Sequence, residues 1–238
     1  MSQNSKAPSG EQVLASWHKN AAAWVQAIRS RSIQSRELVT NQAIIDAIAH
    51  YQPKTLLDVG CGEGWLSWHF AQLGCKVTAV DAIAELVEAA QQKYPNPNHL
   101  NLRFEQLTYR DINRVLRNSA FDIIACNFSL LDKEDTTTLL HSLPSGLTPD
   151  GHIVIQTLHP CPSEQAEDQA EDQADGWRKE SWKDIGEHFQ GEAPWYYRSL
   201  SSWKLLFSDC KLAIESIIEP MHPSTKTPAS IIFVLRKG

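Results

Sequence analysis

The sequence lacks a long apolar segment, a paired cysteine motif and any excess of basic residues. No apolar run reaches the roughly 18 residues that a membrane-spanning helix needs. The five cysteines are scattered without a Cys-x-x-Cys pair, which argues against a zinc ribbon, another metal site or a disulfide framework. The polar start "MSQNSKAPSGEQ" lacks the apolar centre of a signal peptide. We therefore expect a cytoplasmic protein with reduced thiols, no membrane partner and a disordered tail over residues 1–10.

The net charge of −6 arises from one stretch of the chain. Residues 164–175, "EQAEDQAEDQAD", contain six acidic residues and no Lys or Arg, and the rest of the chain has 22 acidic and 22 basic residues. We expect a solvated loop here, with a short exposed helix or a partner-binding tail as alternatives. The neutral remainder argues against a nucleic-acid partner, since such proteins carry a basic surface.

Strand-like and helix-like runs alternate from residue 55 to residue 158, which we expect to form the cofactor-binding core. Strands are predicted at 55–59, 76–80, 101–106, 121–126 and 152–157, with helices near 64–73, 83–93, 110–117 and 133–143. Continuous apolar runs such as "DIIA" are typical of strands that are buried on both faces. The pattern predicts an α/β fold, a mostly parallel sheet with helices on both sides, within a single domain over residues 11–238.

The segments on either side of this core are predicted to cover it. Residues 11–50 have apolar residues at helical spacing and are expected to form N-terminal cap helices. Residues 159–198 combine the acidic stretch with an aromatic segment and are expected to form a lid. In the final part, residues 199–238, a helix is predicted near 199–209, with strands at 211–218 and 230–236.

A glycine-rich loop follows the first predicted strand. In "LLDVGCGEGWLS", residues 56–67, Gly60, Gly62 and Gly64 stand between a strand and a helix. Glycines let the backbone approach a ligand, and the helix N-terminus offers free N–H groups. Asp81 ends the next predicted strand, where a carboxylate can accept hydrogen bonds from two ribose hydroxyls. Both NAD-binding and methyl-donor-binding folds have this arrangement.

Trp65 separates these two classes. The dinucleotide fingerprint requires a small residue at its sixth position, so that helix and strand pack closely and a pyrophosphate fits. Counted from Gly60, that position is Trp65. The loop therefore favours a nucleoside ligand without phosphates.

"LLDVGCGEGWLS" and "VTAVDAIAELVEAA" resemble motifs I and II of the class I methyltransferases, which use S-adenosyl-L-methionine (SAM). They are most similar to bacterial small-molecule-type members with "GCGEGWL". The resemblance covers residues 55–158 and implies a three-layer Rossmann-like fold. Its seven-stranded sheet would have the order 3-2-1-4-5-7-6, with the last strand antiparallel. It also implies SAM as cofactor, S-adenosyl-L-homocysteine (SAH) as product and in-line methyl transfer to a small-molecule acceptor.

The resemblance assigns cofactor contacts along the chain. They are Gly60, Cys61, Gly62, Gly64, Asp81, Ala82, Thr108, Tyr109, Asn127 and Phe128, with Trp24 at the end of "SWHKNAAAW", which resembles a helix that closes over the cofactor. Family members often have an acidic residue after the third strand, where this chain has "LTYRD". Asp111 is either a displaced version of that acid or a surface residue. Cys61 is interpreted as a small loop residue rather than a nucleophile, because no base lies near it in sequence.

Candidate catalytic and acceptor-binding residues lie after the fifth predicted strand. His159, in "TLHPC", follows that strand and is a candidate general base, with a turn-shaping role before Pro160 as the alternative. Tyr196 is a second catalytic candidate. The residues predicted to bind a polar acceptor are Tyr197, Arg198 and His222. The alternative for "PWYY" is packing within the lid.

Two other functions share the same fold prediction. Tryptophans near Arg178, Lys179 and Lys183 could stack on bases in an RNA methyltransferase, and a protein acceptor belongs to the same class. A non-catalytic SAM-binding module is the other alternative.

Overall fold

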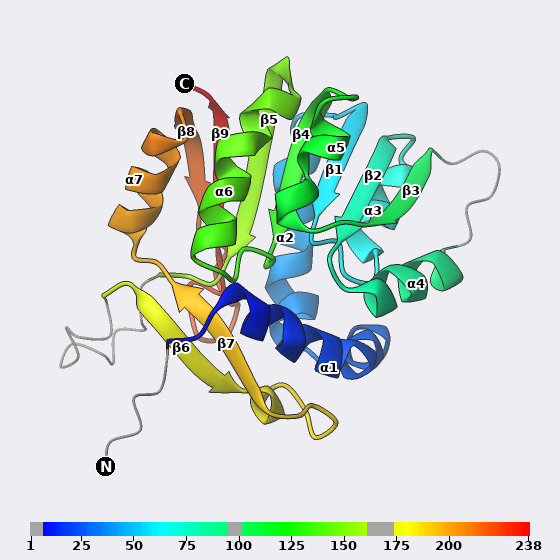
Figure 1. Cartoon of the computed structure of the whole chain (residues 1–238), viewed down its shortest axis with the longest axis vertical. Coiled ribbons are helices and arrows are strands. Elements are labelled where there is room, and N and C mark those ends of the chain that lie inside the picture. Colours follow the sequence, from blue (N-terminus) through cyan, green and yellow to red (C-terminus); the bar gives the residue numbers. More distant parts are fainter. Residues whose placement is uncertain (1–6, 95–100, 161–173) are drawn as a thin grey trace.

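A seven-stranded sheet runs through the computed structural model, which describes residues 7–94, 101–160 and 174–238 (Figure 1). In spatial order its strands are β3 (Leu102–Gln106), β2 (Lys76–Asp81), β1 (Thr55–Val59), β4 (Phe121–Asn127), β5 (Leu147–Thr157), β9 (Ile231–Lys237) and β8 (Leu212–Ile218). Strands β3 to β5 are parallel, and β9 is antiparallel to both neighbours. Numbered within this sheet, the order is 3-2-1-4-5-7-6, so the predicted fold class and topology are confirmed.

Helices cover both faces of the sheet, as Figure 1 shows. They are α2 (Asn41–Ala49), α3 (Trp65–Gln72), α4 (Ala84–Lys93), α5 (Asn113–Leu116), α6 (Glu134–Ser142) and α7 (Leu200–Asp209). Short 3-10 turns lie at Tyr109–Asp111, Leu143–Gly146 and Trp182–Asp184, and a π-helical turn, Arg36–Thr40, precedes α2. Within the described residues, no helix has the length and apolar character needed to cross a membrane.

Alternate residues of the strands face two separate cores. In β9, Phe233 and Leu235 belong to the core under α5, α6 and α7, whereas Ile232 and Val234 belong to the core under α2 and α3. Both sets are almost completely buried. Since the strands are apolar on both faces, their continuous hydrophobic runs are the physical reason for the three-layer arrangement.

Helix α1 (Gly10–Arg29) lies across the carboxyl ends of the parallel strands, below the sheet in Figure 1. A hairpin of β6 (Gly176–Ser181) and β7 (Glu192–Tyr197) packs against it. The Asn20 amide donates to the Gln190 carbonyl and accepts from the Gln190 N–H, at 3.0 and 2.8 Å. The Trp182 ring stacks on Phe189 and donates to Ser16. The segment predicted as a lid thus contains an antiparallel hairpin that supports α1.

This hairpin was not predicted as strands, because "WRKES" and "EAPWYY" show no clear alternation and Pro194 interrupts the second run. In the structure Lys179 is paired with Pro194 across the two strands of the hairpin, and β7 packs on α1. Residues 164–173 of the acidic stretch, and therefore the predictions about it, lie outside the described residues.

Candidate functional site

A cavity of about 1040 Å³, including its opening to solvent, lies between α1 and the carboxyl ends of β1, β2 and β4. Ligands of open α/β sheets bind at this edge. The predicted cofactor contacts that line it are Trp24, Gly60, Cys61, Gly62, Asp81, Ala82, Thr108, Tyr109, Asn127 and Phe128. Residues that are distant in sequence are thus brought to one cavity, and of the eleven predicted contacts only Gly64 is absent from its lining.

The glycine loop after β1 is held by backbone hydrogen bonds. The N–H groups of Gly60 and Cys61 donate to the Val80 carbonyl at 2.8 and 3.0 Å. Gly60 has a φ of +77°, and a Cβ there would lie 2.3 Å from the Ser129 Cβ. Only glycine fits this position, because both the backbone conformation and the space exclude a side chain.

Gly64 lies outside the lining of the cavity and packs against β3. It has a φ of +83° and caps α3, and a Cβ there would lie 2.6 Å from the Phe104 ring. The close approach of helix and strand therefore occurs at Gly64. Trp65, the next residue, begins α3 and lines the cavity. Its indole occupies the position where a dinucleotide loop has a small residue, which agrees with the argument against a pyrophosphate.

The Asp81 carboxylate is fixed by two backbone donors. Its oxygens accept from the N–H groups of Gly62 and Ile83, both at 2.9 Å. Burial raises the pKa of Asp81, and these hydrogen bonds oppose that shift. Each carboxylate oxygen has a second lone pair available. Asp81 can therefore hold the glycine loop and accept two further hydrogen bonds from a ligand.

Tyr109 and Ser129 form the opposite wall. The Tyr109 hydroxyl donates to the Ser129 carbonyl at 2.6 Å, and the Ser129 hydroxyl donates to the Val59 carbonyl at 2.7 Å. Phe128 lies in the left-handed region with a φ of +52°, which is uncommon for a side chain of this size. Asp111 accepts from the Thr108 hydroxyl at 2.8 Å and does not line the cavity. Its position favours a surface role over a displaced adenine contact.

Buried polar atoms without hydrogen-bond partners are concentrated at this cavity. Of the seven such side-chain atoms among the described residues, four belong to lining residues: Arg36 Nη2, Glu63 Oε1, Asn127 Oδ1 and Asp132 Oδ2. Native proteins pair nearly all buried polar groups, so these four indicate a ligand that supplies the missing partners.

Arg36, Glu63 and Asp132 were not among the predicted site residues. Glu63 and Asp132 occur in the segments "GCGEGWL" and "FSLLD", each of which follows a predicted strand. An acidic residue in such a loop is the sequence feature that could have identified them. Arg36 follows the break after α1 and carried no sequence signal, because its position depends on the packing of two distant tryptophans.

Burial raises the pKa of the Cys61 thiol well above its ordinary value, and the neighbouring Asp81 and Asp58 carboxylates act in the same direction. The thiol is therefore kept protonated. This favours the small-residue interpretation of Cys61 over the nucleophile.

The residues predicted for catalysis and acceptor binding do not line the cavity. His159 Nε2 lies 2.8 Å from the Glu219 carboxylate, on the side of β9 and β8. The Tyr197 hydroxyl donates to the Pro160 carbonyl, within the base of the hairpin. His222 Nδ1 accepts from the N–H groups that follow it, within an exposed turn. The catalytic and acceptor-binding roles of these three side chains stay predictions.

Tyr196 and Arg198 connect the hairpin to the loop after β4. The Tyr196 N–H donates to the Leu131 carbonyl at 2.8 Å, and Arg198 Nη2 donates to the Lys133 carbonyl at 2.7 Å. Arg198 is buried and lies over the rings of Tyr196 and Trp203. The guanidinium N–H groups of Arg198 donate to backbone carbonyls of the loop after β4, and Arg198 does not line the cavity.

Residues 56–151 match the model of a family described as a methyltransferase domain. These residues, about two fifths of the chain, are similar to a methyltransferase domain. The family prediction made from the glycine loop and Asp81 is confirmed, and the matched region contains the loops after β1 to β4 that form the cavity floor.

Sequence relatives of this methyltransferase domain include a ubiquinone biosynthesis O-methyltransferase of Glaesserella parasuis, 34% identical over 109 residues, with 44% of this chain and 46% of the relative covered. An uncharacterized methyltransferase of Mycobacterium tuberculosis is 34% identical over 116 residues, with 49% and 56% covered. The matches span about half the length of these relatives.

Solved structures resemble the methyltransferase domain over nearly the whole chain. The DhpI–SAM–HEP complex has a TM-score of 0.68 at 16% identity, covering 98% of this chain and all of the other. A SAM-dependent methyltransferase from Clostridium acetobutylicum has a TM-score of 0.64 at 17% identity, covering 93% and 99%. At such identities the likeness concerns the fold.

Proposed function

We propose that the protein is a SAM-dependent methyltransferase that transfers a methyl group to a small-molecule acceptor. The observation that carries this proposal is the cavity itself, where a glycine loop fixed by Asp81 meets four buried polar atoms without partners. The family match and the O-methyltransferase relatives support the same reaction, and the relatives favour a small acceptor over a macromolecule.

The residues present fit this cofactor. Gly60 and Gly62 let the loop backbone line the cavity where the methionyl chain would lie, and the Asp81 oxygens can accept the ribose hydroxyls. Ala82, Ile83 and the side chains of Leu14 and Trp17 provide apolar walls for the adenine ring. When bound, SAM supplies a methyl group that its sulfonium charge has already activated for in-line displacement.

The protein contributes position and exclusion of water. Helix α1 covers the cavity, and Trp17 and Trp24 on this helix line it. Holding two reactants in line can lower a barrier by about 7–11 kcal/mol, because the entropy of bringing them together has already been lost on binding. A cavity of this kind needs neither a nucleophile nor a metal ion to perform the transfer.

An acceptor hydroxyl also requires a group that takes its proton. Asp132, from the loop after β4, lines the cavity and is 6% exposed, with Oδ2 unpartnered. Burial raises the pKa of Asp132, and the neighbouring Asp135 and Glu134 add to the shift. A raised pKa suits a general base that works near neutral pH. We assign this role to Asp132 in place of His159, which is paired with Glu219.

Calorimetry with SAM and SAH tests the proposal. We expect SAH to bind the wild-type protein and Asp81→Ala to weaken it on the order of 100-fold, because two charge-assisted hydrogen bonds and the loop support are lost. Asp111→Ala, outside the cavity, is the matched control. Absence of binding at millimolar ligand, or unchanged affinity in Asp81→Ala, would contradict the proposal.

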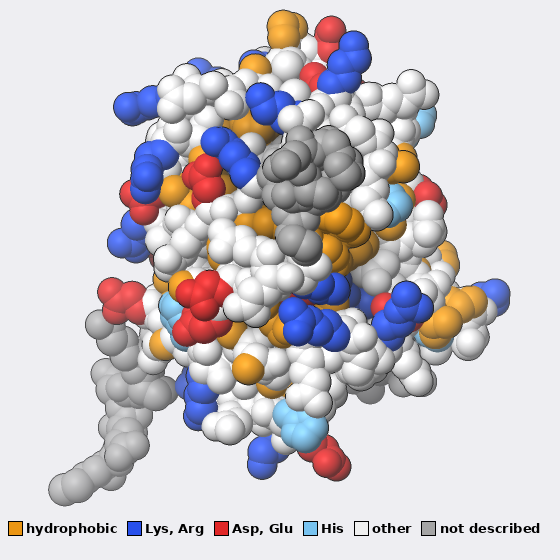
Figure 2. Space-filling model, turned by 90° about the vertical axis from the view of Figure 1, so that its right-hand side faces the viewer, with side chains coloured by type: hydrophobic (Ala, Val, Ile, Leu, Met, Phe, Trp, Pro, Cys, Tyr) orange, Lys and Arg blue, Asp and Glu red, His pale blue; other side chains and the backbone are white. Residues whose placement is uncertain are grey.

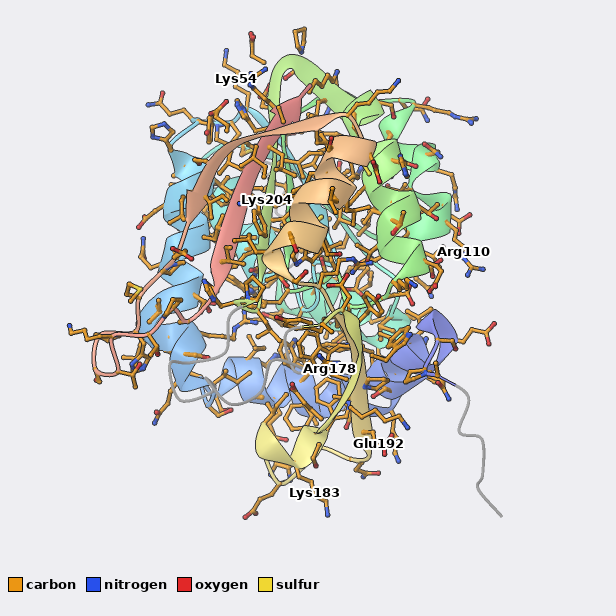
Figure 3. All side chains as sticks on the ribbon, turned by 90° about the vertical axis from the view of Figure 1, so that its left-hand side faces the viewer. Lys54, Arg110, Arg178, Lys183, Glu192 and Lys204 are labelled. Atoms are coloured by element: carbon orange, nitrogen blue, oxygen red, sulfur yellow. The ribbon has the colours of Figure 1, made fainter. Side chains whose placement is uncertain are left out.

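The RNA alternative has less support from the hairpin. Trp182 is 2% exposed and packed on α1, so it offers no stacking surface. Lys179 pairs with Glu192 at 3.1 Å, while Lys183 points outward at the far end of the hairpin (Figure 3). On the face shown in Figure 2, basic and acidic side chains are interspersed. Retention of bulk tRNA on filters at low salt would favour this alternative.

A non-catalytic SAM-binding module is distinguished by turnover. We expect SAM to be converted to SAH when the protein is added to a cell extract that contains small-molecule acceptors. Conversion that persists after macromolecules are removed by filtration identifies the acceptor as small. Binding of SAM without any conversion would instead favour the module.

A further inference from the structure

Two carboxylates stand in the part of the cavity between the start of α1 and the loop after β4. Asp132 and Asp135 line the cavity there together with Gly10, the first residue of α1, and with the apolar side chains of Val13 and Leu131. A Cβ on Gly10 would lie 3.0 Å from Asp132 Oδ2 and 3.2 Å from Asp135 Oδ2. The two Oδ2 atoms therefore lie beside the same point, at a position where α1 carries no side chain.

Asp132 uses only one of its two carboxylate oxygens within the described residues. Its Oδ1 accepts from the Asp135 N–H in the first turn of α6. Its Oδ2 is buried without a partner, and the residue is 6% exposed. A buried carboxylate oxygen that accepts no hydrogen bond is costly, and native proteins rarely contain one. The free oxygen therefore indicates a donor that a ligand supplies.

The charged residues that line the cavity are mostly acidic. The acidic ones are Asp58, Glu63, Asp81, Asp132 and Asp135. Among the described lining residues Arg36 is the one basic side chain, and its guanidinium carbon lies 5.6 and 5.3 Å from the ring centres of Trp24 and Trp65. Asp135 pairs with Arg110, which is 74% exposed and outside the lining, so this pair compensates little charge. A cavity lined by one sign of charge attracts ligands of the opposite sign.

An ammonium group fits the two carboxylates better than a hydroxyl or an anion. It has three N–H donors and can bond to two oxygens at once, whereas a hydroxyl has one donor. A hydrogen bond between two charged groups is also roughly twice as strong as one between neutral groups. A carboxylate on the acceptor would have no donor here and would meet like charges, which acts against its binding.

We infer that the acceptor is an amine, which binds as its ammonium ion to Asp132 and Asp135 with its apolar part against Val13 and Leu131. This inference rests on the proposed function and specifies the class of acceptor. Asp132 keeps its role as general base. The N–H bond breaks, its electron pair stays on the nitrogen, and the proton goes to Asp132 Oδ2.

Three probes that share a phenyl ring test the inference. They are 2-phenylethylamine, 2-phenylethanol and phenylacetate, which are a cation, a neutral molecule and an anion at pH 7. Calorimetry on protein saturated with SAH measures their affinities. For the wild-type protein we expect the amine to bind about 10-fold more tightly than the alcohol, and phenylacetate to bind more weakly than the alcohol.

Three variants locate this preference. Asp132→Asn keeps the shape and the Oδ1 acceptor but removes the charge, so the preference for the amine over the alcohol should fall to within about 3-fold. Asp135→Asn should lower the preference less, since Asp135 is already paired with Arg110. Glu134→Gln changes an exposed acid of the same helix outside the lining, and this matched control should keep the full preference. Circular dichroism of each variant checks its fold.

The outcomes distinguish the inference from the function on which it rests. If the wild-type protein binds SAH but binds the amine no better than the alcohol, the inference is wrong while the proposed function stands. The same conclusion follows if folded Asp132→Asn keeps the full preference, and the wild-type comparison decides if that variant does not fold. If the wild-type protein does not bind SAH, the proposed function and the inference are both overturned.

Discussion

The Tyr109 hydroxyl donates a 2.6 Å hydrogen bond to the Ser129 carbonyl, joining the loop after β3 to the loop after β4. The Ser129 hydroxyl in turn donates to the Val59 carbonyl at the end of β1. Three loops that the sequence separates are thus connected across one wall of the cavity. Because the connection runs through side chains, the geometry of this wall depends on single atoms that can be removed by substitution.

Tyr109→Phe removes one of these atoms. We expect the free energy of unfolding to fall by about 1–2 kcal/mol, since a buried carbonyl loses its partner, and SAH to bind several-fold more weakly. Urea titration and calorimetry measure the two effects. Tyr94→Phe, in a ring stacked on Trp68, is the comparison and should change neither by a similar amount. Equal behaviour of the two variants would show that the hydroxyl has no role in the wall.

Gly64→Ala tests the close approach of α3 to β3. The added Cβ would meet the Phe104 ring at 2.6 Å and also require the left-handed conformation. The conformation costs roughly 1–2 kcal/mol and the overpacking about 1–3 kcal/mol. We expect their sum as a loss of stability in urea titration.

Gly74→Ala is the matched control for this substitution. Gly74 has a φ of +89°, yet a Cβ there meets nothing within 4 Å. Only the conformational cost of roughly 1–2 kcal/mol should appear. If both alanine variants lose the same stability, packing against Phe104 contributes nothing.

Asp58, buried beneath the glycine loop, predicts a pH dependence of stability. Burial raises the pKa of Asp58 from 3.8 to about 7, against the hydrogen bond that it accepts from Ser67. Between these values the folded protein retains a proton that the unfolded chain has released. The contribution to stability is therefore fully present below about pH 4 and is lost as the pH rises to about 7.

Asp58→Asn should remove this contribution to the pH profile. We expect the decrease in the free energy of unfolding between pH 5 and pH 8 to be smaller in the variant, by at most about 3 kcal/mol. Urea titration at both pH values measures it. Asp46→Asn, an exposed site on α2, should leave the wild-type profile unchanged. A variant profile parallel to that of the wild type would contradict the assignment to Asp58.

Asn20→Ala tests the attachment of the hairpin to α1. Asn20 is 1% exposed, and its amide holds both backbone groups of Gln190. Loss of these bonds should raise the rate of proteolysis within residues 176–197 and weaken SAH binding, because α1 loses its support. Asn118→Ala, on an exposed turn, is the control for both measurements. Unchanged proteolysis would mean that the aromatic contacts alone hold the hairpin.

The strands could be predicted because buried parallel strands are continuous apolar runs, and their order was implied by the resemblance of the two motifs to the class I methyltransferases. The cofactor loop could be predicted for a similar reason, since Gly60 has a conformation and a space that only glycine fits, and Gly62 has a φ of +57° that favours glycine. The same motif includes Gly64, and its packing against the Phe104 ring depends on a different strand and has no local pattern.

The remaining site residues depend on tertiary packing that has no local pattern. Arg36 enters the cavity because Trp24 and Trp65 hold it there, and neither neighbour is close in sequence. His159 was expected at the site because it follows β5, but its ring pairs with Glu219, which follows β8, and it does not line the cavity. A strand end determines the edge of the sheet at which a residue lies, and the surrounding side chains determine its direction.

The hydrogen bond between the Tyr196 N–H and the Leu131 carbonyl links the support of α1 to the wall of the cavity. If a ligand leaves past the N-terminal half of α1, we expect the hairpin and the loop after β4 to separate in the same event. The dissociation rate of SAH then measures the free energy of a local opening in addition to the contacts of the ligand. Ligand exchange and hydrogen exchange of the Tyr196 amide should consequently have the same temperature dependence.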